Sequence, residues 1–138
     1  MKVLLISLLI PYFSCKSQSN EEKMIKTADG IINSFKNGSE QTFIDLIGVD
    51  LKTIGKNKDI IHSDFTKLCK TSEKFPNIQR NFIDIPNELG QKVIQVLFYK
   101  TNSTDKKDVQ MRLDLYFGPP SINSMDRLSG YKIINPNL

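Results

Sequence analysis

The feature that most constrains the fold is a run of nine residues, 109–117, in which apolar and polar side chains alternate strictly. Successive side chains of a strand point to opposite faces of its sheet, so this period of two predicts a strand with one buried face. The polar stretch 101–107 predicts a turn, and residues 91–101 are expected to pair antiparallel with the strand. The apolar members are Val109, Met111, Leu113, Leu115 and Phe117, and the polar members are Gln110, Arg112, Asp114 and Tyr116.

The N-terminal half follows the 3.6-residue period of amphipathic helices instead. A first helix is expected over residues 22–36, with Gly38 in the left-handed position that commonly ends a helix. Ser39 is a residue type that caps helix N-termini, and it predicts a short second helix. A third helix is expected over about residues 57–71, after a loop that contains Gly55.

The remaining strands are predicted from shorter β-rich runs, namely 81–85, 93–99 and 130–134. Helices followed by an antiparallel meander predict an α+β fold, in which N-terminal helices pack on a curved antiparallel β-sheet. The length of the chain suits one such domain, expected over residues 22–138.

The first fifteen residues have the pattern of a secretory leader. Lys2 precedes an apolar run, and Cys15 directly follows the small residue Ser14. We expect residues 1–14 to be a signal peptide cut by signal peptidase II, and Cys15 to carry lipid on its sulfur. The polar residues 15–21 would then form the lipidated cysteine and its tether.

Two other interpretations of this segment stay open. It would also suit an ordinary secretory leader, or a buried first element of a cytosolic domain. A membrane-spanning helix is not expected, because residues 3–13 are fewer than the roughly 20 apolar residues that such a helix needs.

The leader resembles that of bacterial lipoproteins. Ser14 and Cys15 match the lipobox, whereas Tyr12 and Phe13 stand where leucine and a small residue are usual. Relaxed lipoboxes of this kind resemble those of small Bacteroidetes lipoproteins. The resemblance implies a protein of the bacterial cell envelope that is anchored in the outer membrane by lipid and faces the periplasm or the cell surface.

Residues 22–135 resemble the NTF2-like (cystatin-like) superfamily. The resemblance rests on element order, on residues 35–39 between the first two helices, and on the closing strand that begins at Gly130. It implies a cone of helices and sheet with space for a pocket between them. Enzymes of that superfamily use acids, tyrosines or a histidine inside the cone, but no such motif carries over to this chain.

Charge, cysteine usage and missing motifs exclude several classes of function. The formal net charge is +4 and the lysines are scattered, so no nucleic-acid partner is expected. The single histidine does not support a zinc site of ordinary ligand count. Phosphate-loop, dinucleotide and nucleophile-elbow motifs are missing from the sequence, so no cofactor is expected.

Three polar residues on one face of the 109–117 strand are the candidate site. Arg112, Asp114 and Tyr116 would supply a cation, an acid and a phenol if that face lined a pocket. If the face is solvated, they form an ordinary row of surface charges, and this second interpretation is favoured.

Other side chains are expected to be structural. Cys69 lies on an apolar helical stripe, which predicts a buried thiol, and His62 lies off that stripe and is expected on the surface. Five phenylalanines would either line the cone or fill it, namely Phe35, Phe43, Phe65, Phe98 and Phe117.

These features favour a non-enzymatic, lipid-anchored domain that binds a small apolar ligand or another envelope protein. Two alternatives remain. One is an immunity or inhibitor lipoprotein that blocks a partner's active site. The other is an enzyme of the isomerase or dehydratase type, which requires two titratable groups that converge in an apolar pocket.

Overall fold

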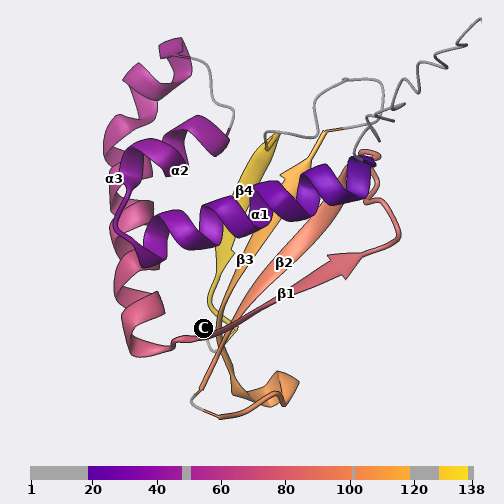
Figure 1. The fold of residues 1–138 in the computed structure, drawn as a ribbon. Helices are drawn as coiled ribbons and strands as arrows, with labels where there is room; N and C mark the ends of the chain where they lie inside the picture. Colours follow the sequence, from indigo (N-terminus) through magenta and orange to yellow (C-terminus); the bar gives the residue numbers. More distant parts are fainter. Residues whose placement is uncertain (1–18, 48–50, 101, 119–127, 137–138) are drawn as a thin grey trace, which may run out of the picture.

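A computed structural model describes residues 19–47, 51–100, 102–118 and 128–136. The predicted signal peptide, Cys15 and most of the tether lie outside these residues. The elements are, in order, α1 (Asn20–Lys36), α2 (Glu40–Leu46), α3 (Leu51–Lys74), β1 (Asn77–Ile83), β2 (Lys92–Tyr99), the short 3-10 helix η1 (Lys106–Asp108), β3 (Val109–Phe117) and β4 (Gly130–Ile134) (Figure 1).

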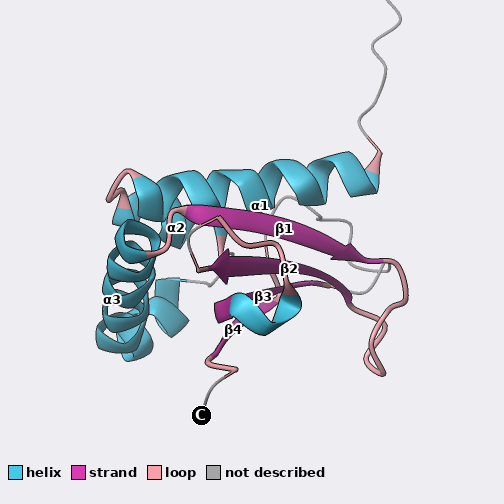
Figure 2. Cartoon of the chain, turned by 90° about the horizontal axis from the view of Figure 1, so that it is seen from below, coloured by secondary structure: helices cyan, strands magenta, loops and turns pink. Residues whose placement is uncertain are grey.

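The strands form one antiparallel sheet in the order β1-β2-β3-β4. Helix α1 crosses one face of this curled sheet, and α2 and α3 gather near the C-terminal end of α1 (Figures 1 and 2). Within the described ranges, the other face carries no helix longer than η1. The predicted α+β fold, with N-terminal helices on a curved antiparallel sheet, is therefore confirmed.

Local interactions define both ends of α1. Ser19 Oγ accepts from the Glu22 backbone amide at 3.2 Å, and the Glu22 carboxylate accepts from the Ser19 amide at 3.2 Å, which is a capping box. Gly38 has a φ of +69°, as its predicted position at the end of the helix requires. The helix starts at Asn20, so two residues assigned to the tether are helical.

Two predicted boundaries were wrong. Helix α3 begins at Leu51, six residues before the predicted start, because Gly55 lies inside the helix rather than in a loop. A single glycine costs a helix about 1 kcal/mol, which tertiary packing readily offsets. Strand β1 covers Asn77–Ile83 rather than 81–85. The three residues in its middle are all exposed, so buried and exposed side chains do not alternate along it as expected of a half-buried strand.

The core lies between the helices and the covered face of the sheet. The predicted pairing of β2 with β3 is confirmed, with Ile94 opposite Leu115 and Val96 opposite Leu113. These side chains and the five phenylalanines named above are all buried. Phe35 and Phe98 have ring centroids 5.7 Å apart, so aromatic rings meet across the layers.

Candidate functional site

The uncovered face of the sheet carries a pocket of about 290 Å³, which we call the outer-face pocket. The register of the strands explains its position. Leu97 lies opposite Arg112, and Arg112 lies opposite Ile134. These residues alternate along their strands with residues that point into the core, so they share the uncovered face. All four strands, η1 and the residues after β4 contribute to it. The lining residues are Asn81, Gln95, Leu97, Lys106, Val109, Arg112, Ile134 and Pro136.

The pocket combines apolar walls with cationic and amide groups. Leu97, Val109 and Ile134 supply aliphatic surface, while Arg112 and Lys106 supply positive charge. Apolar walls with a few convergent polar groups are typical of sites for small amphipathic molecules. In such a molecule, an acidic headgroup would pair with the cations of the pocket, and the apolar part of the molecule would pack against the aliphatic side chains.

A bulge brings Val109 into this pocket. Strict alternation places Val109 on the same face as Met111, under the helices. The pairing shifts between Phe98 and Tyr99, so that Met111 lies opposite Phe98 but Val109 lies opposite Tyr99. The extra residue in β3 turns Val109 out of the core and into the wall of the outer-face pocket.

Arg112 and Asp114 form an ion pair on this face. Arg112 Nε lies 2.9 Å from Asp114 Oδ1, and Arg112 Nη2 donates to Asp114 Oδ2 at 3.1 Å. The side chain of Asp114 is only 7% exposed, whereas that of Arg112 is 37% exposed. The favoured expectation of an ordinary solvated row was therefore wrong for Asp114, which is buried beneath the guanidinium.

The fit between these two groups is incomplete. Nε and Oδ1 are close enough to attract electrostatically, but neither has an aligned hydrogen-bond partner among the described residues. Buried polar atoms without an aligned partner are uncommon in folded proteins. Arg112 therefore lines the pocket as a cation that is paired with a buried carboxylate.

Tyr116 belongs to the same face but not to the lining of the outer-face pocket. Partial burial raises the pKa of its hydroxyl, and the neighbouring Asp114 carboxylate raises it further, against a smaller opposing effect of Arg112. Of the three candidate residues, the structure thus places Arg112 in the pocket, Asp114 in contact with Arg112, and Tyr116 beside them.

The predicted pocket inside the cone has no counterpart in the three described pockets, none of which is lined by the five phenylalanines. Phe43 and Phe65 have ring centroids 5.4 Å apart, and all five rings belong to one cluster. The five rings are therefore packed together in the core formed by the described residues.

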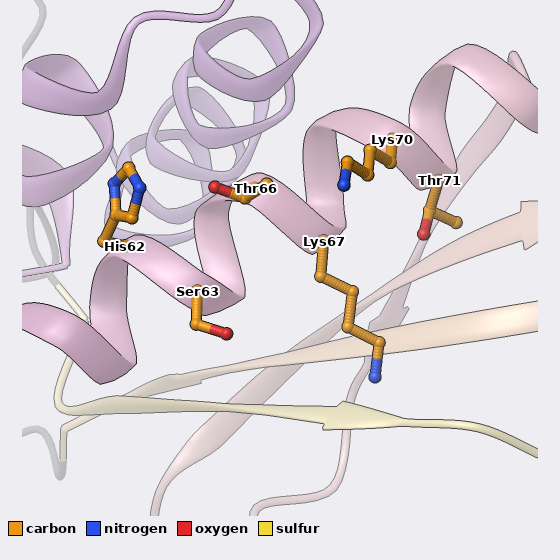
Figure 3. A pocket seen from close by; sticks show the side chains of 6 residues that line it. All are labelled: His62, Ser63, Thr66, Lys67, Lys70 and Thr71. Atoms are coloured by element: carbon orange, nitrogen blue, oxygen red, sulfur yellow. The ribbon is translucent and has the colours of Figure 1, made fainter.

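Two larger hollows lie on the helices and are poorer candidates. A furrow of about 500 Å³ is lined by His62, Ser63, Thr66, Lys67, Lys70 and Thr71. All six side chains in this lining come from α3 and spread along it (Figure 3), so the described residues enclose the furrow from one helix only. A groove of about 520 Å³ between α2 and α3 surrounds the exposed His62–Glu40 pair, whose Nδ1 and Oε1 lie 2.9 Å apart.

A tyrosine–carboxylate pair joins the sheet to α3. The Tyr131 hydroxyl on β4 donates to Asp64 Oδ2 at 2.8 Å, and the Tyr131 ring packs edge-on against Phe43. Burial, and then the hydrogen bond and charge of Asp64, raise the pKa of Tyr131 well above its usual value. Sequence reasoning missed this pair because 67 residues separate its members and neither lies in a motif.

The Tyr131–Asp64 bond predicts a pH-dependent contribution to stability. At pH 7, Tyr131→Phe should lower the free energy of unfolding by about 1–2 kcal/mol, because a half-buried carboxylate loses its donor. In the unfolded chain the hydroxyl ionises near pH 10, whereas the folded protein keeps the proton. Stability from this group therefore falls as pH rises above about 10.

Urea unfolding of the wild type and of Tyr131→Phe between pH 7 and pH 11 would measure this effect. The difference in free energy of unfolding between the two proteins should become smaller above about pH 10. Other tyrosines and the lysines are common to both proteins and cancel in the difference. If this difference stays constant from pH 7 to pH 11, folding does not shift the titration of Tyr131.

Cys69 packs against the core as the apolar stripe predicts, but its side chain is only partly buried. Burial, followed by the charge of Glu73, raises the pKa of this thiol, which disfavours the reactive thiolate. Across the described part of the chain, no three His, Cys, Asp or Glu side chains are grouped closely enough to hold a metal ion.

The sequence matches no protein-family model, and searches of curated proteins and of solved structures give no match. In the described ranges, none of the helices has the length and apolar character needed to cross a membrane.

Proposed function

We propose that this chain is a lipid-anchored protein of the bacterial cell envelope whose domain binds, without catalysis, a small amphipathic ligand in the outer-face pocket. The observation that carries the proposal is the pocket itself. Leu97, Val109 and Ile134 give it aliphatic walls, and Arg112 and Lys106 add positive charge. The ligand class that fits this chemistry is a small molecule with an apolar body and one acidic group.

The anchoring part of the proposal is supported by the leader. Signal peptidase II would cut before Cys15, and a diacylglycerol on its sulfur plus an acyl chain on its new N-terminus would attach the protein. Stable membrane attachment requires two lipid signals of this kind. The capping box at Ser19 starts the folded domain only four residues after Cys15, so a lipidated protein would hold its domain close to the bilayer.

Two neighbouring lysines offer a matched test of the binding part. Lys106 and Lys107 are both exposed on η1, but only Lys106 lines the outer-face pocket. Titration of purified residues 16–138 with octanoate should show saturable binding and a rise in melting temperature, because the ligand stabilises the folded state. Lys106→Ala should weaken binding by roughly threefold to fivefold, the effect of one exposed ion pair, and Lys107→Ala should leave it unchanged.

The same titration with octanol separates charge recognition from simple apolar binding. Octanol should bind more weakly than octanoate and should not distinguish Lys106→Ala from the wild type. Equal losses in the two lysine variants, or no binding of either probe, would contradict the proposed ligand class. Turnover of isomerase or dehydratase substrates that disappears when a single carboxylate or Tyr116 is replaced would favour the enzyme alternative.

A further inference from the structure

The turn between β1 and β2 exposes two large aliphatic side chains. Ile85 is 79% exposed and Leu89 is 75% exposed, and Pro86 between them is also exposed. Burial of large aliphatic side chains away from water is favourable, so these two side chains on one short turn offer a candidate contact surface.

This turn is ordered by its own hydrogen bonds. Asn87 Oδ1 accepts from the backbone amides of Leu89 at 3.0 Å and Gln91 at 2.9 Å, and the Asn87 amide donates to the Gln91 carbonyl at 2.9 Å. The Gly90 amide donates to the Asn87 carbonyl at 2.9 Å, and Gly90 has a φ of +72°. Satisfied backbone groups lower the cost of placing the turn in an apolar environment.

The turn lies at the same end of the molecule as the start of α1. Figures 1 and 2 both place the β1–β2 turn and the start of α1 at this end, away from α3. Cys15 precedes Ser19 by four positions, which can span at most roughly 14 Å. A lipid on Cys15 would therefore hold this end of the domain against the bilayer.

We propose that Ile85 and Leu89 insert into the apolar edge of the lipid bilayer and fix the orientation of the anchored domain. This inference rests on the proposed lipid anchor at Cys15. The occupant is a phospholipid surface, because the lipid on Cys15 would hold this end of the domain against the bilayer. The exposed charges of the turn itself, Asp84 and Glu88, are both negative and supply no electrostatic attraction to anionic lipid. The contact is therefore apolar and should persist at high salt.

The sequence contains no tryptophan, so a single introduced tryptophan reports its own surroundings. The full lipidated chain carrying Leu89→Trp would be reconstituted into phosphatidylcholine vesicles, with and without brominated phosphatidylcholine. Ile85→Trp provides a second report from the same turn. Ile60→Trp is the matched control, because Ile60 is 61% exposed on α3, far from the start of α1.

We expect the emission of Leu89→Trp and Ile85→Trp to shift to shorter wavelength in vesicles, to be quenched by brominated lipid, and to stay so in 1 M salt. Ile60→Trp should keep its aqueous emission. Flotation of the vesicles and the mass of the Cys15 peptide are recorded on the same samples. Lipidated protein that floats but shows aqueous emission from the turn overturns the insertion alone. Protein without lipid on Cys15 overturns the proposed anchor and the insertion with it. A shift that disappears in salt, or appears equally at Ile60, also overturns the insertion.

Discussion

Leu113→Ala is expected to lower the free energy of unfolding by about 2–5 kcal/mol, as do other deletions of fully buried leucines. Leu113 is 0% exposed at the centre of β3, opposite Val96 on β2 and Ile133 on β4. The substitution removes apolar contacts and leaves a cavity under the helices. Its effect would be measured as a lower urea midpoint in equilibrium unfolding, with the slope of the transition unchanged.

Leu89→Ala is the matched control for this prediction. It deletes the same atoms from a leucine that is 75% exposed, and it should change stability by less than about 0.5 kcal/mol in solution. If Leu113→Ala proved as mild as Leu89→Ala, the register of β3 would be wrong by one residue, because such a slip exchanges the two faces of a strand.

Cys15→Ser is expected to abolish both lipid attachment and cleavage of the leader. Serine cannot form the thioether that holds the diacylglycerol, so signal peptidase II would have no lipidated substrate to cut. The variant should keep its leader and carry no lipid, whereas the wild type should be cut before Cys15 and carry lipid there. The loss of lipid is complete rather than partial, because the diacylglycerol is joined to the protein through the Cys15 sulfur, and mass spectrometry of the membrane-extracted protein measures it.

Cys69→Ser makes the same chemical change at the other cysteine. Because Cys69 is half-buried on α3 and is not part of the leader, this variant should stay attached to membranes. A Cys15→Ser protein that is cut and lipidated like the wild type, or loss of lipid in both variants, would contradict the proposed anchor.

The fold could be predicted wherever side-chain period and local chemistry agree. The alternation over 109–117 identified β3 and its covered face, and Gly38 marked the end of α1. Prediction failed where tertiary packing outweighs local preference. Gly55 is tolerated inside α3, and β1 extends through exposed polar residues because it is an edge strand with one paired side.

The candidate site could be predicted only in part. Alternation places Arg112 and Asp114 on one face, but it does not reveal that Asp114 is buried beneath the guanidinium. Val109 reaches the outer-face pocket through a bulge, which leaves no signal in the alternation. Lys106 and Ile134 lie far apart in the sequence and converge only through the order of the strands.

Amide chemical-shift mapping with octanoate is the most direct test of ligand binding in the outer-face pocket, because it shows which residues the ligand contacts. If octanoate binds in the outer-face pocket, the shift changes should concentrate on residues around it, such as Leu97, Arg112 and Ile134. These changes should saturate together and weaken in Lys106→Ala but not in Lys107→Ala. Changes centred on the α3 furrow at Thr66 and Lys70, or no saturable change at the uncovered face of the sheet, would contradict binding in the outer-face pocket.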